Sequence, residues 1–408
     1  MKKIWDKWTE IALVKRILVG LILGAILGIA VPQATGIAIL GDVFVSALKA
    51  IAPLLVFFLV ISSLCNAGKS HGGVIKTVII LYMFSTVLAA VIAVFASMAF
   101  PVKMTLANAA TDTSAPQGIV EVLNNLLLNV VANPVSSLVN ANYVGILMWA
   151  VLLGLAFRVA DKMTKKVLAD VADGISMVVT WIINLAPFGI FGLVFNTVST
   201  NGLDIFTTYG KLLILLVGCM LFIYFVTNPL LVYWCIRQNP YPLIFQCLKR
   251  SALTAFFTRS SAANIPVNMK VCEEMGLDRD TYSVTIPLGA TINMDGAAIT
   301  ITVMTMATAF TLGIHVDIPT AIILSLLAAL SACGASGVAG GSLLLIPMAC
   351  SLFGISDDIS MQVVAVGFII GVVQDSVETA LNSSSDLLLS ASAEFRQWRL
   401  EGKEIKFK

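Results

Sequence analysis

The sequence predicts an all-α polytopic membrane protein with eight transmembrane helices and two re-entrant helical hairpins arranged as inverted repeats. Of its 408 residues, 58% are hydrophobic and 12% are charged, whereas a soluble domain has roughly 25% charged residues. A helix needs about 20 mostly apolar residues to cross a bilayer, and the apolar stretches of this chain reach that length. Because the chain is so apolar, we expect membrane lipid around it. Its formal net charge is only +2, so we expect no nucleic-acid partner.

Eight apolar stretches define the predicted spans. They cover residues 11–31, 37–66, 73–100, 118–157, 168–198, 209–236, 281–312 and 359–393. The fourth is too long for one span, and Asn133-Pro134 and the segment 140–142 interrupt it, so we expect several short helices there. Asp6 and Glu10 precede the first stretch, and no small-residue cleavage site is followed by a soluble mature domain, so we expect a retained span and not a signal peptide.

Positive charge alternates along the predicted loops. Lys and Arg gather before the first span, between the second and third, after the fourth, after the sixth and at the end of the chain. The alternate loops, 107–118, 199–204 and 354–358, contain neither residue. Because positive loops stay in the cytoplasm, we expect a multi-pass protein of the cell inner (plasma) membrane with both termini cytoplasmic.

Two apolar regions, 241–272 and 318–353, are interrupted in the middle by small and polar residues. The interruptions are Thr258–Pro266 and Ser331–Ser342, both rich in Ser, Ala or Gly. Such residues weaken a continuous helix, whereas a chain that turns back at mid-depth needs small residues and accessible backbone. Each pattern therefore indicates a re-entrant hairpin.

The two hairpins recur with similar spacing to a polar span. Asp295 follows Pro266 by 29 residues, and Asp375 follows Pro347 by 28. The charges beside the hairpins place their ends on opposite sides of the membrane, which predicts an inverted repeat; in transporters such repeats meet at the substrate site. Two unrelated kinks are the alternative, but irregular backbone at membrane depth persists only inside protein or beside a water-filled cavity.

Span seven contains Asn293-Met294-Asp295-Gly296 at its centre. A lipid-facing Asp295 would be costly, and Gly296 can unwind the helix beside it. Free carbonyl groups, an amide oxygen and a carboxylate make an all-oxygen environment that suits a hard cation. A structural ion pair between Asp295 and Arg259 is the alternative.

Span eight has polar residues on one helical face and span three has a weaker group. Five residues of span eight share a face because their spacing matches the helical period; they are Asp375, Glu378, Thr379, Asn382 and Asp386. An inward stripe of this kind can bind an ammonium group, a sodium ion or a proton, and a structural role is the alternative. In span three, Tyr82, Ser85 and Thr86 offer hydroxyl groups, although bonding within their own helix explains them equally well.

Four motifs in fixed order resemble one known family. TRSSAANIP (258–266), NMDGA (293–297), CGASGVAGG (333–341) and QDSVETALNSSSD (374–386) resemble the glutamate-transporter type sodium:dicarboxylate symporter family, and within it the bacterial sodium:serine/threonine symporters. The resemblance implies a homotrimeric transporter of the elevator type. It implies no catalytic residues. It implies a scaffold of residues 1–72 (spans one and two) and 101–207 (spans four and five), and a transport domain of residues 73–100 (span three) and 208–408.

The resemblance also implies a substrate site and three sodium sites. Asp375 would hold the substrate's amino group and Asn382 its carboxylate. The implied substrate-binding residues are Arg259, Ser260, Ser261, Gly337, Gly341, Asp375, Glu378, Thr379 and Asn382. The implied sodium ligands are Asp386 with Gly289, Asn293 and Asn382 at the first site, Thr291 with Met294, Ser331, Ala332 and Gly334 at the second, and Tyr82, Ser85, Thr86, Asn293 and Asp295 at the third.

Three positions depart from the pattern of the acidic-substrate carriers. Glu378 stands where they have an Arg that holds a side-chain carboxylate, and Ala297 replaces a Thr. Gly371 replaces an Asp that supports the hairpin Arg in one branch, so Arg259 is expected to lean on Glu378, unless Glu378 contacts the substrate itself. A second carboxylate on the substrate would meet the negative charge of Glu378.

We therefore expect a sodium-coupled symporter that imports small neutral hydroxyl amino acids, serine and threonine first. Sodium- or proton-coupled transport of other small neutral or acidic amino acids is the alternative. An ion channel is more distant because it needs no inverted hairpins. An intramembrane protease is also distant, because Asp295 and Asp375 lack the sequence context of a paired acid and base.

Overall fold

The computed structural model describes residues 11, 13–66, 73–106, 128, 131–202, 204–333 and 340–405. Within these ranges every regular element is a helix, as predicted. By length and composition, six described helical segments can cross a membrane; they are Thr35–Ser62, Gly73–Ala99, Lys162–Asn184, Thr207–Ile236, Arg279–Thr311 and Asp357–Leu400. The prediction of a helical membrane protein is confirmed.

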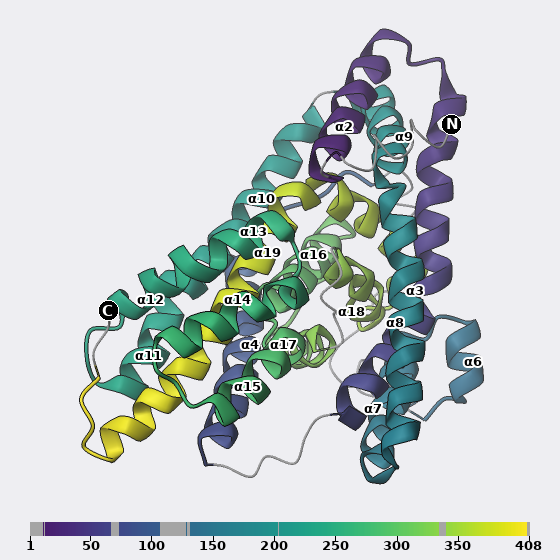
Figure 1. The fold of residues 1–408 in the computed structure, drawn as a ribbon. Helices are drawn as coiled ribbons and strands as arrows, with labels where there is room; N and C mark the ends of the chain where they lie inside the picture. Colours follow the sequence, from purple (N-terminus) through teal and green to yellow (C-terminus); the bar gives the residue numbers. More distant parts are fainter. Residues whose placement is uncertain are drawn as a thin grey trace.

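One group of helices comes from the N-terminal half of the chain (Figure 1). Its elements are α2 (Leu13–Ala30), η1 (Thr35–Ile37), α3 (Ala38–Asn66), α6 (Pro134–Val139), α7 (Tyr143–Ala156), η2 (Phe157–Val159), α8 (Lys162–Asn184) and α9 (Ala186–Asn201). Helix α2 packs along α9, and α3 packs against α7, α8 and α9. A Cβ added at Gly20 would lie 2.2 Å from the Pro187 carbonyl oxygen, and one at Gly24 would lie 2.6 Å from that of Phe191. Glycine is therefore what lets these two backbones approach so closely.

The prediction of helix breaks in this group is confirmed for the segment after Asn133 and is wrong for the segment around Leu185. Asn133 caps α6 by accepting hydrogen bonds from the backbone N–H groups of Val135 and Ser136, and Asn142 caps α7. The expected short helices are thus confirmed for the described part of 118–157. The single stretch expected at 168–198 is instead two helices that meet at Leu185, because Pro187 in the first turn of α9 has no N–H for a continuing helix.

The second group holds α4 (Gly73–Ala99) and the C-terminal half of the chain. Its other elements are α10 (Asp204–Phe222), the π-helix η3 (Ile223–Thr227), α11 (Asn228–Ile236), α12 (Tyr241–Cys247), the π-helix η4 (Leu248–Ala252), α13 (Leu253–Thr258), α14 (Ser261–Glu274), α15 (Arg279–Ile292), α16 (Asp295–Thr311), α17 (Ile318–Ala332), η5 (Gly341–Leu345), α18 (Ile346–Ser351) and α19 (Asp357–Leu400). The long helix α19 runs through this group (Figure 1) and contacts α4, α10, α11, α13, α14, α15, α16 and α18.

The two groups meet mainly along α19, and also through η5, α18 and α10. Helix α19 contacts α2, α3 and α9, and η5 contacts α3. A cavity of about 260 Å³ remains between them, and Asp42, Asn196, Tyr209 and Gln362 are among its lining residues. The contact between the groups is therefore partly polar and incompletely packed.

Both interrupted regions form a helix, a break and a second helix. In the first, α13 ends at Thr258 and is followed by Arg259, which has a left-handed φ of 53°. Ser260 then caps α14 by accepting a hydrogen bond from the backbone N–H of Ala263. In the second, α17 is followed by η5 and α18, which contact it. The expected tip of this hairpin, with Gly334 and Gly337, lies outside the described residues.

Span seven is broken where the sequence predicts unwinding. Helix α15 ends at Ile292 and α16 begins at Asp295, so Asn293 and Met294 form a non-helical link between them. Every residue of α16 from Asp295 to Ala309 is buried. The break therefore lies deep inside the second group, against α4 and α19.

Candidate substrate and sodium sites

The break between α15 and α16 is held against the polar face of α19. The side-chain oxygen of Asn382 accepts a hydrogen bond of 2.7 Å from the backbone N–H of Gly296. A Cβ at Gly296 would lie 2.9 Å from the Cα of Glu378, so only glycine lets α16 start this close to α19. The free N–H at the start of α16 is thus satisfied by a side chain of the neighbouring helix.

The predicted first sodium site is a compact group around Asp386, which is 1% exposed. Asn293 donates to Asp386 Oδ1 at 2.9 Å, and the hydroxyl of Tyr82 donates to the Asp386 backbone carbonyl at 2.8 Å. A Cβ at Gly289 would lie 2.8 Å from Asp386 Oδ1. Asp386 Oδ2 and Asn293 Oδ1 are buried and have no hydrogen-bond donor among the described residues. Buried acceptors are normally satisfied, so these two unpaired oxygens suit a bound cation.

The predicted third site lies on the other side of the same break. Asp295 is 0% exposed; its Oδ2 accepts from Ser85 at 2.7 Å and its Oδ1 from Thr86 at 3.1 Å. The hydroxyls of span three therefore face another helix and do not bond within their own. Within the described ranges no cationic side chain pairs with Asp295, so the alternative of an ion pair with Arg259 is wrong. Tyr82, expected here, contacts Asp386 and the Thr285 carbonyl instead.

The predicted second site is formed by the ends of two helices. Cys333 Sγ lies 3.6 Å from the carbonyl oxygen of Ile292, so the C-terminal ends of α15 and α17 are close together. Terminal helix carbonyls lack helical partners and carry partial negative charge, which attracts a cation. The hydroxyls of Thr291 and Ser331 donate to carbonyls of their own helices, Leu288 and Leu327. Met294 and Ala332 are buried beside these ends.

The three predicted sodium sites offer several kinds of oxygen atom as ligands. Among the described residues there is no cluster of three or more His, Cys, Asp or Glu side chains. Each candidate site instead combines at most one carboxylate with hydroxyl, amide or backbone oxygens. This set matches a hard cation of low charge better than a transition metal.

Arg259 and Asp375 form a buried ion pair at the tip of the first hairpin. Arg259 Nη2 and Nε donate to Asp375 Oδ2 at 2.6 and 2.7 Å, and the two side chains are 10% and 5% exposed. The expectation that Arg259 leans on Glu378 is therefore wrong. The physical reason is that the Glu378 carboxylate is engaged by α16 and η5, which leaves Asp375 as the carboxylate that meets the guanidinium.

Glu378 connects three elements through one of its oxygens. Its Oε2 accepts hydrogen bonds from Thr300 on α16 at 2.6 Å, from Ser342 on η5 at 3.0 Å and from Gln374 on α19 at 2.5 Å. Its Oε1 has no donor in the part of the chain that the structure describes. Glu378 thus anchors the second hairpin and still has one acceptor oxygen available.

The remaining predicted substrate residues lie around this pair of carboxylates. Thr379 and Asn382 are 6% and 4% exposed on α19. Ser260 and Ser261 begin α14, and Gly341 begins η5. Helices α13 and α14 and η5 all contact α19, so the structure brings the described members of the predicted site to the same helix.

Sequence reasoning missed several polar partners in this region. Asn264 donates to Ser383 Oγ at 2.8 Å and Asn268 donates to the Ser383 carbonyl at 2.8 Å, which fixes the first hairpin to α19. The spacing of four between these asparagines on an apolar background is the signal that could have found them. Asn228 follows the π-helix η3, is 0% exposed and accepts a 3.5 Å hydrogen bond from Ser85; π-turns are often found at functional sites.

Comparison with known proteins agrees with this geometry. Residues 13–394 match the sodium:dicarboxylate symporter family. The chain is 57% identical over 401 residues to "Serine/threonine transporter SstT" of Bifidobacterium adolescentis, covering 98% of this chain and 93% of that protein. It is 54% and 55% identical over 400 residues to proteins of the same name from two strains of Streptococcus thermophilus, covering 98% of this chain and 100% of each relative. The chain belongs to the sodium:dicarboxylate symporter family.

Proposed function

We propose that this protein imports serine and threonine across the cell inner membrane together with sodium ions. The observation that best supports this proposal lies at the break between α15 and α16. There, Asp386 and Asn293 each have a buried oxygen with no hydrogen-bond donor among the described residues. The name of the relatives, serine/threonine transporter, supports the substrate. Family membership supports sodium as the coupled ion.

In the proposed mechanism the substrate's ammonium group binds Asp375 and its carboxylate binds near Asn382. Arg259 already pairs with Asp375 in this structure, so an arriving ammonium group shares or replaces that contact. A neutral amino acid brings one positive and one negative group, which leaves the charge of the site balanced. Serine and threonine then place their hydroxyl within reach of Glu378, which follows Asp375 by one helical turn.

Sodium and substrate are coupled because both stabilise the same arrangement of the break. Asn293 contacts Asp386 on α19, and Asn382 contacts Gly296 at the start of α16. An ion that orders Asn293 therefore also orders the segment beside the substrate site. Coupling of this kind is reciprocal, so sodium raises the affinity for substrate by the same factor as substrate raises the affinity for sodium.

Transport then follows an elevator cycle in a homotrimer. Both termini of each subunit are cytoplasmic. Residues 1–72 and 101–207 form the fixed scaffold, and residues 73–100 and 208–408 form the domain that moves. The second hairpin closes over the substrate before the domain moves inward. The helices form two packed groups with a partly polar cavity between them. This arrangement supports the proposal that one group slides along the other.

The competing functions lack support from the contacts of the site. Proteolysis needs two carboxylates that act together, whereas Asp295 bonds to Ser85 and Thr86 and Asp375 bonds to Arg259. A simple channel has no need for a buried ion pair such as that of Arg259 and Asp375. Acidic substrates would meet Glu378, and a carboxylate repels like charge strongly where the dielectric constant is low.

Uptake by purified protein in liposomes tests this proposal. Radiolabelled serine is supplied outside with an inward sodium gradient, and the matched control replaces sodium with potassium at equal ionic strength. We expect serine uptake only with sodium, with competition by threonine and none by aspartate. Equal serine uptake in potassium would contradict sodium coupling, and strong competition by aspartate would contradict the substrate assignment.

A further inference from the structure

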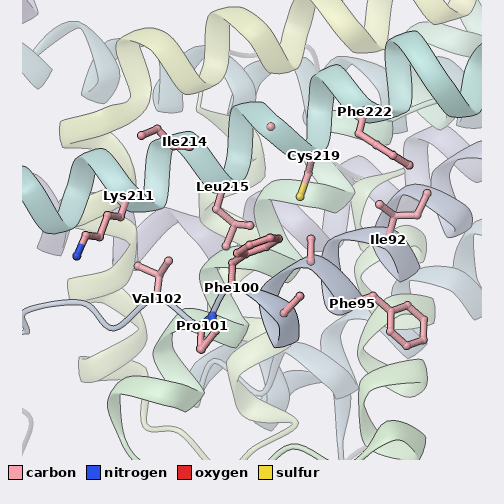
Figure 2. A pocket seen from close by; sticks show the side chains of 13 residues that line it. Ile92, Phe95, Phe100, Pro101, Val102, Lys211, Ile214, Leu215, Cys219 and Phe222 are labelled. Atoms are coloured by element: carbon pink, nitrogen blue, oxygen red, sulfur yellow. The ribbon is translucent and has the colours of Figure 1, made fainter.

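An apolar groove lies outside the candidate transport site, between the C-terminal end of α4 and the part of α10 from Lys211 to Phe222. Its volume is about 820 Å³, and its lining includes Ala96, Ala99, Phe100, Lys211, Leu215 and Gly218. We call it the α4–α10 groove. Figure 2 shows Lys211 at one end and Phe222 at the other, with Leu215 and Phe100 between them.

The groove exists because small residues lie between large ones. Ala96 and Ala99 on α4 and Gly218 on α10 leave space that Phe100 and Phe222 border. A Cβ added at Gly218 would meet no atom within 4 Å, so this position opens onto the groove. An empty apolar trench would lose dispersion contacts along its walls, which a matching apolar chain restores.

The groove faces a membrane environment. Both helices that form it are long and apolar enough to cross a bilayer. Among the described lining residues Lys211 alone is charged; it is exposed and lies about one helical turn after Thr207, where the apolar span that includes α10 begins. No hydrogen bond or ion pair joins Lys211 to another described residue. A lysine at the end of a membrane span extends its ammonium group toward the lipid head groups.

We propose that the α4–α10 groove binds a phospholipid with an anionic head group. One acyl chain lies along Ala96, Leu215 and Gly218, and the phosphate pairs with the Lys211 ammonium. Charge complementarity selects this occupant, because an apolar trench with a single positive group at its membrane-boundary end matches an acyl chain with a negative head. A zwitterionic lipid fills the same trench but gains less from Lys211.

Native mass spectrometry of the purified full chain tests the proposal. The protein in detergent is titrated with phosphatidylglycerol or with phosphatidylcholine, and bound lipids are counted. Lys211→Gln should weaken phosphatidylglycerol binding roughly five-fold, the effect of one basic residue at a membrane surface, and should weaken phosphatidylcholine binding by a smaller factor. Gly218→Phe should fill the groove and reduce binding of both lipids.

Two variants far from the groove serve as matched controls. Lys162→Gln removes an exposed lysine at the start of α8, and Gly174→Phe adds a ring on the exposed side of α8, where a Cβ meets nothing within 4 Å. Both should bind lipid like wild type. Thermal unfolding verifies folding, and Gly218→Leu is the smaller filling variant if Gly218→Phe unfolds.

Two results would overturn the proposal. Phosphatidylglycerol binding that is equal in wild type, Lys211→Gln and Gly218→Leu would place the lipid elsewhere. Retention of no phosphatidylglycerol by wild type at any lipid concentration of the titration would mean that the groove does not hold this lipid. Neither result depends on whether the protein transports serine.

Discussion

Replacing Glu378 with Gln should reduce the preference for hydroxyl amino acids without dismantling the site. Glu378 uses Oε2 for Thr300, Ser342 and Gln374, while Oε1 has no donor among the described residues. Gln has nearly the same shape and keeps one acceptor oxygen for the three anchoring donors. The change therefore falls on the oxygen that remains available to a substrate hydroxyl.

The size of the effect follows from the charge that is removed. A hydrogen bond to a charged group contributes about 1.5–3 kcal/mol and one between neutral groups about 0.5–1.5 kcal/mol. The serine hydroxyl can still bond to the amide, so the loss is the difference, about 1 kcal/mol, or roughly five-fold in affinity. Alanine has no hydroxyl, and its affinity should change much less.

Competition of serine uptake by unlabelled serine, threonine and alanine measures this preference. Ser342→Ala is the matched control, because it removes an anchoring donor from Oε2 and leaves Oε1 untouched; it should weaken all three substrates equally. An unchanged ratio of serine to alanine affinity in Glu378→Gln would refute direct contact. Glu378 would then serve only to anchor the second hairpin.

Three further predictions concern the charged groups and one missed residue. Asp375→Asn should lower the affinity for every amino acid by about 10- to 100-fold through loss of a charge-assisted hydrogen bond, while sodium still binds; normal serine affinity would exclude the assignment. Asp386→Asn and Asp295→Asn should each raise the sodium concentration for half-maximal uptake with little change in selectivity, and unaltered sodium dependence in both would remove the ion sites. Asn228→Ala should also weaken sodium dependence, because Asn228 contacts the Ser85 that bonds to Asp295; an unchanged sodium titration in a folded variant would show that Asn228 only packs.

Periodicity was sufficient to predict which residues share a helix face. The polar residues of α19 recur at the helical period, and burial of Asp375, Asn382 and Asp386 follows because charged and polar side chains avoid lipid. The breaks at Arg259 and at Asn293-Met294 were also predictable, since Ser, Gly and Asn weaken a helix locally. These features depend on neighbouring residues in the chain.

The sequence did not predict which buried polar side chains bond to each other. The sequence suggested Asp295 or Glu378 as the partner of Arg259, whereas the structure pairs it with Asp375. The outcome depends on Thr300 and Ser342, which engage Glu378 from other elements. Asn228 gave no signal because its role depends on the π-helix η3, which shifts its position at the start of α11. The break at Leu185 was missed because a helix tolerates proline in its first turn, so Pro187 marks a start only once α8 is known to end.

Serine binding to the purified protein at increasing sodium concentration is the most direct test of the sodium-coupled site. Isothermal titration calorimetry in potassium-balanced buffer gives the serine affinity at each sodium concentration, for wild type and for Asp386→Asn. We predict that serine affinity rises steadily with sodium in wild type and that the rise is strongly reduced in Asp386→Asn. Serine affinity that is independent of sodium in wild type would contradict the proposed coupling.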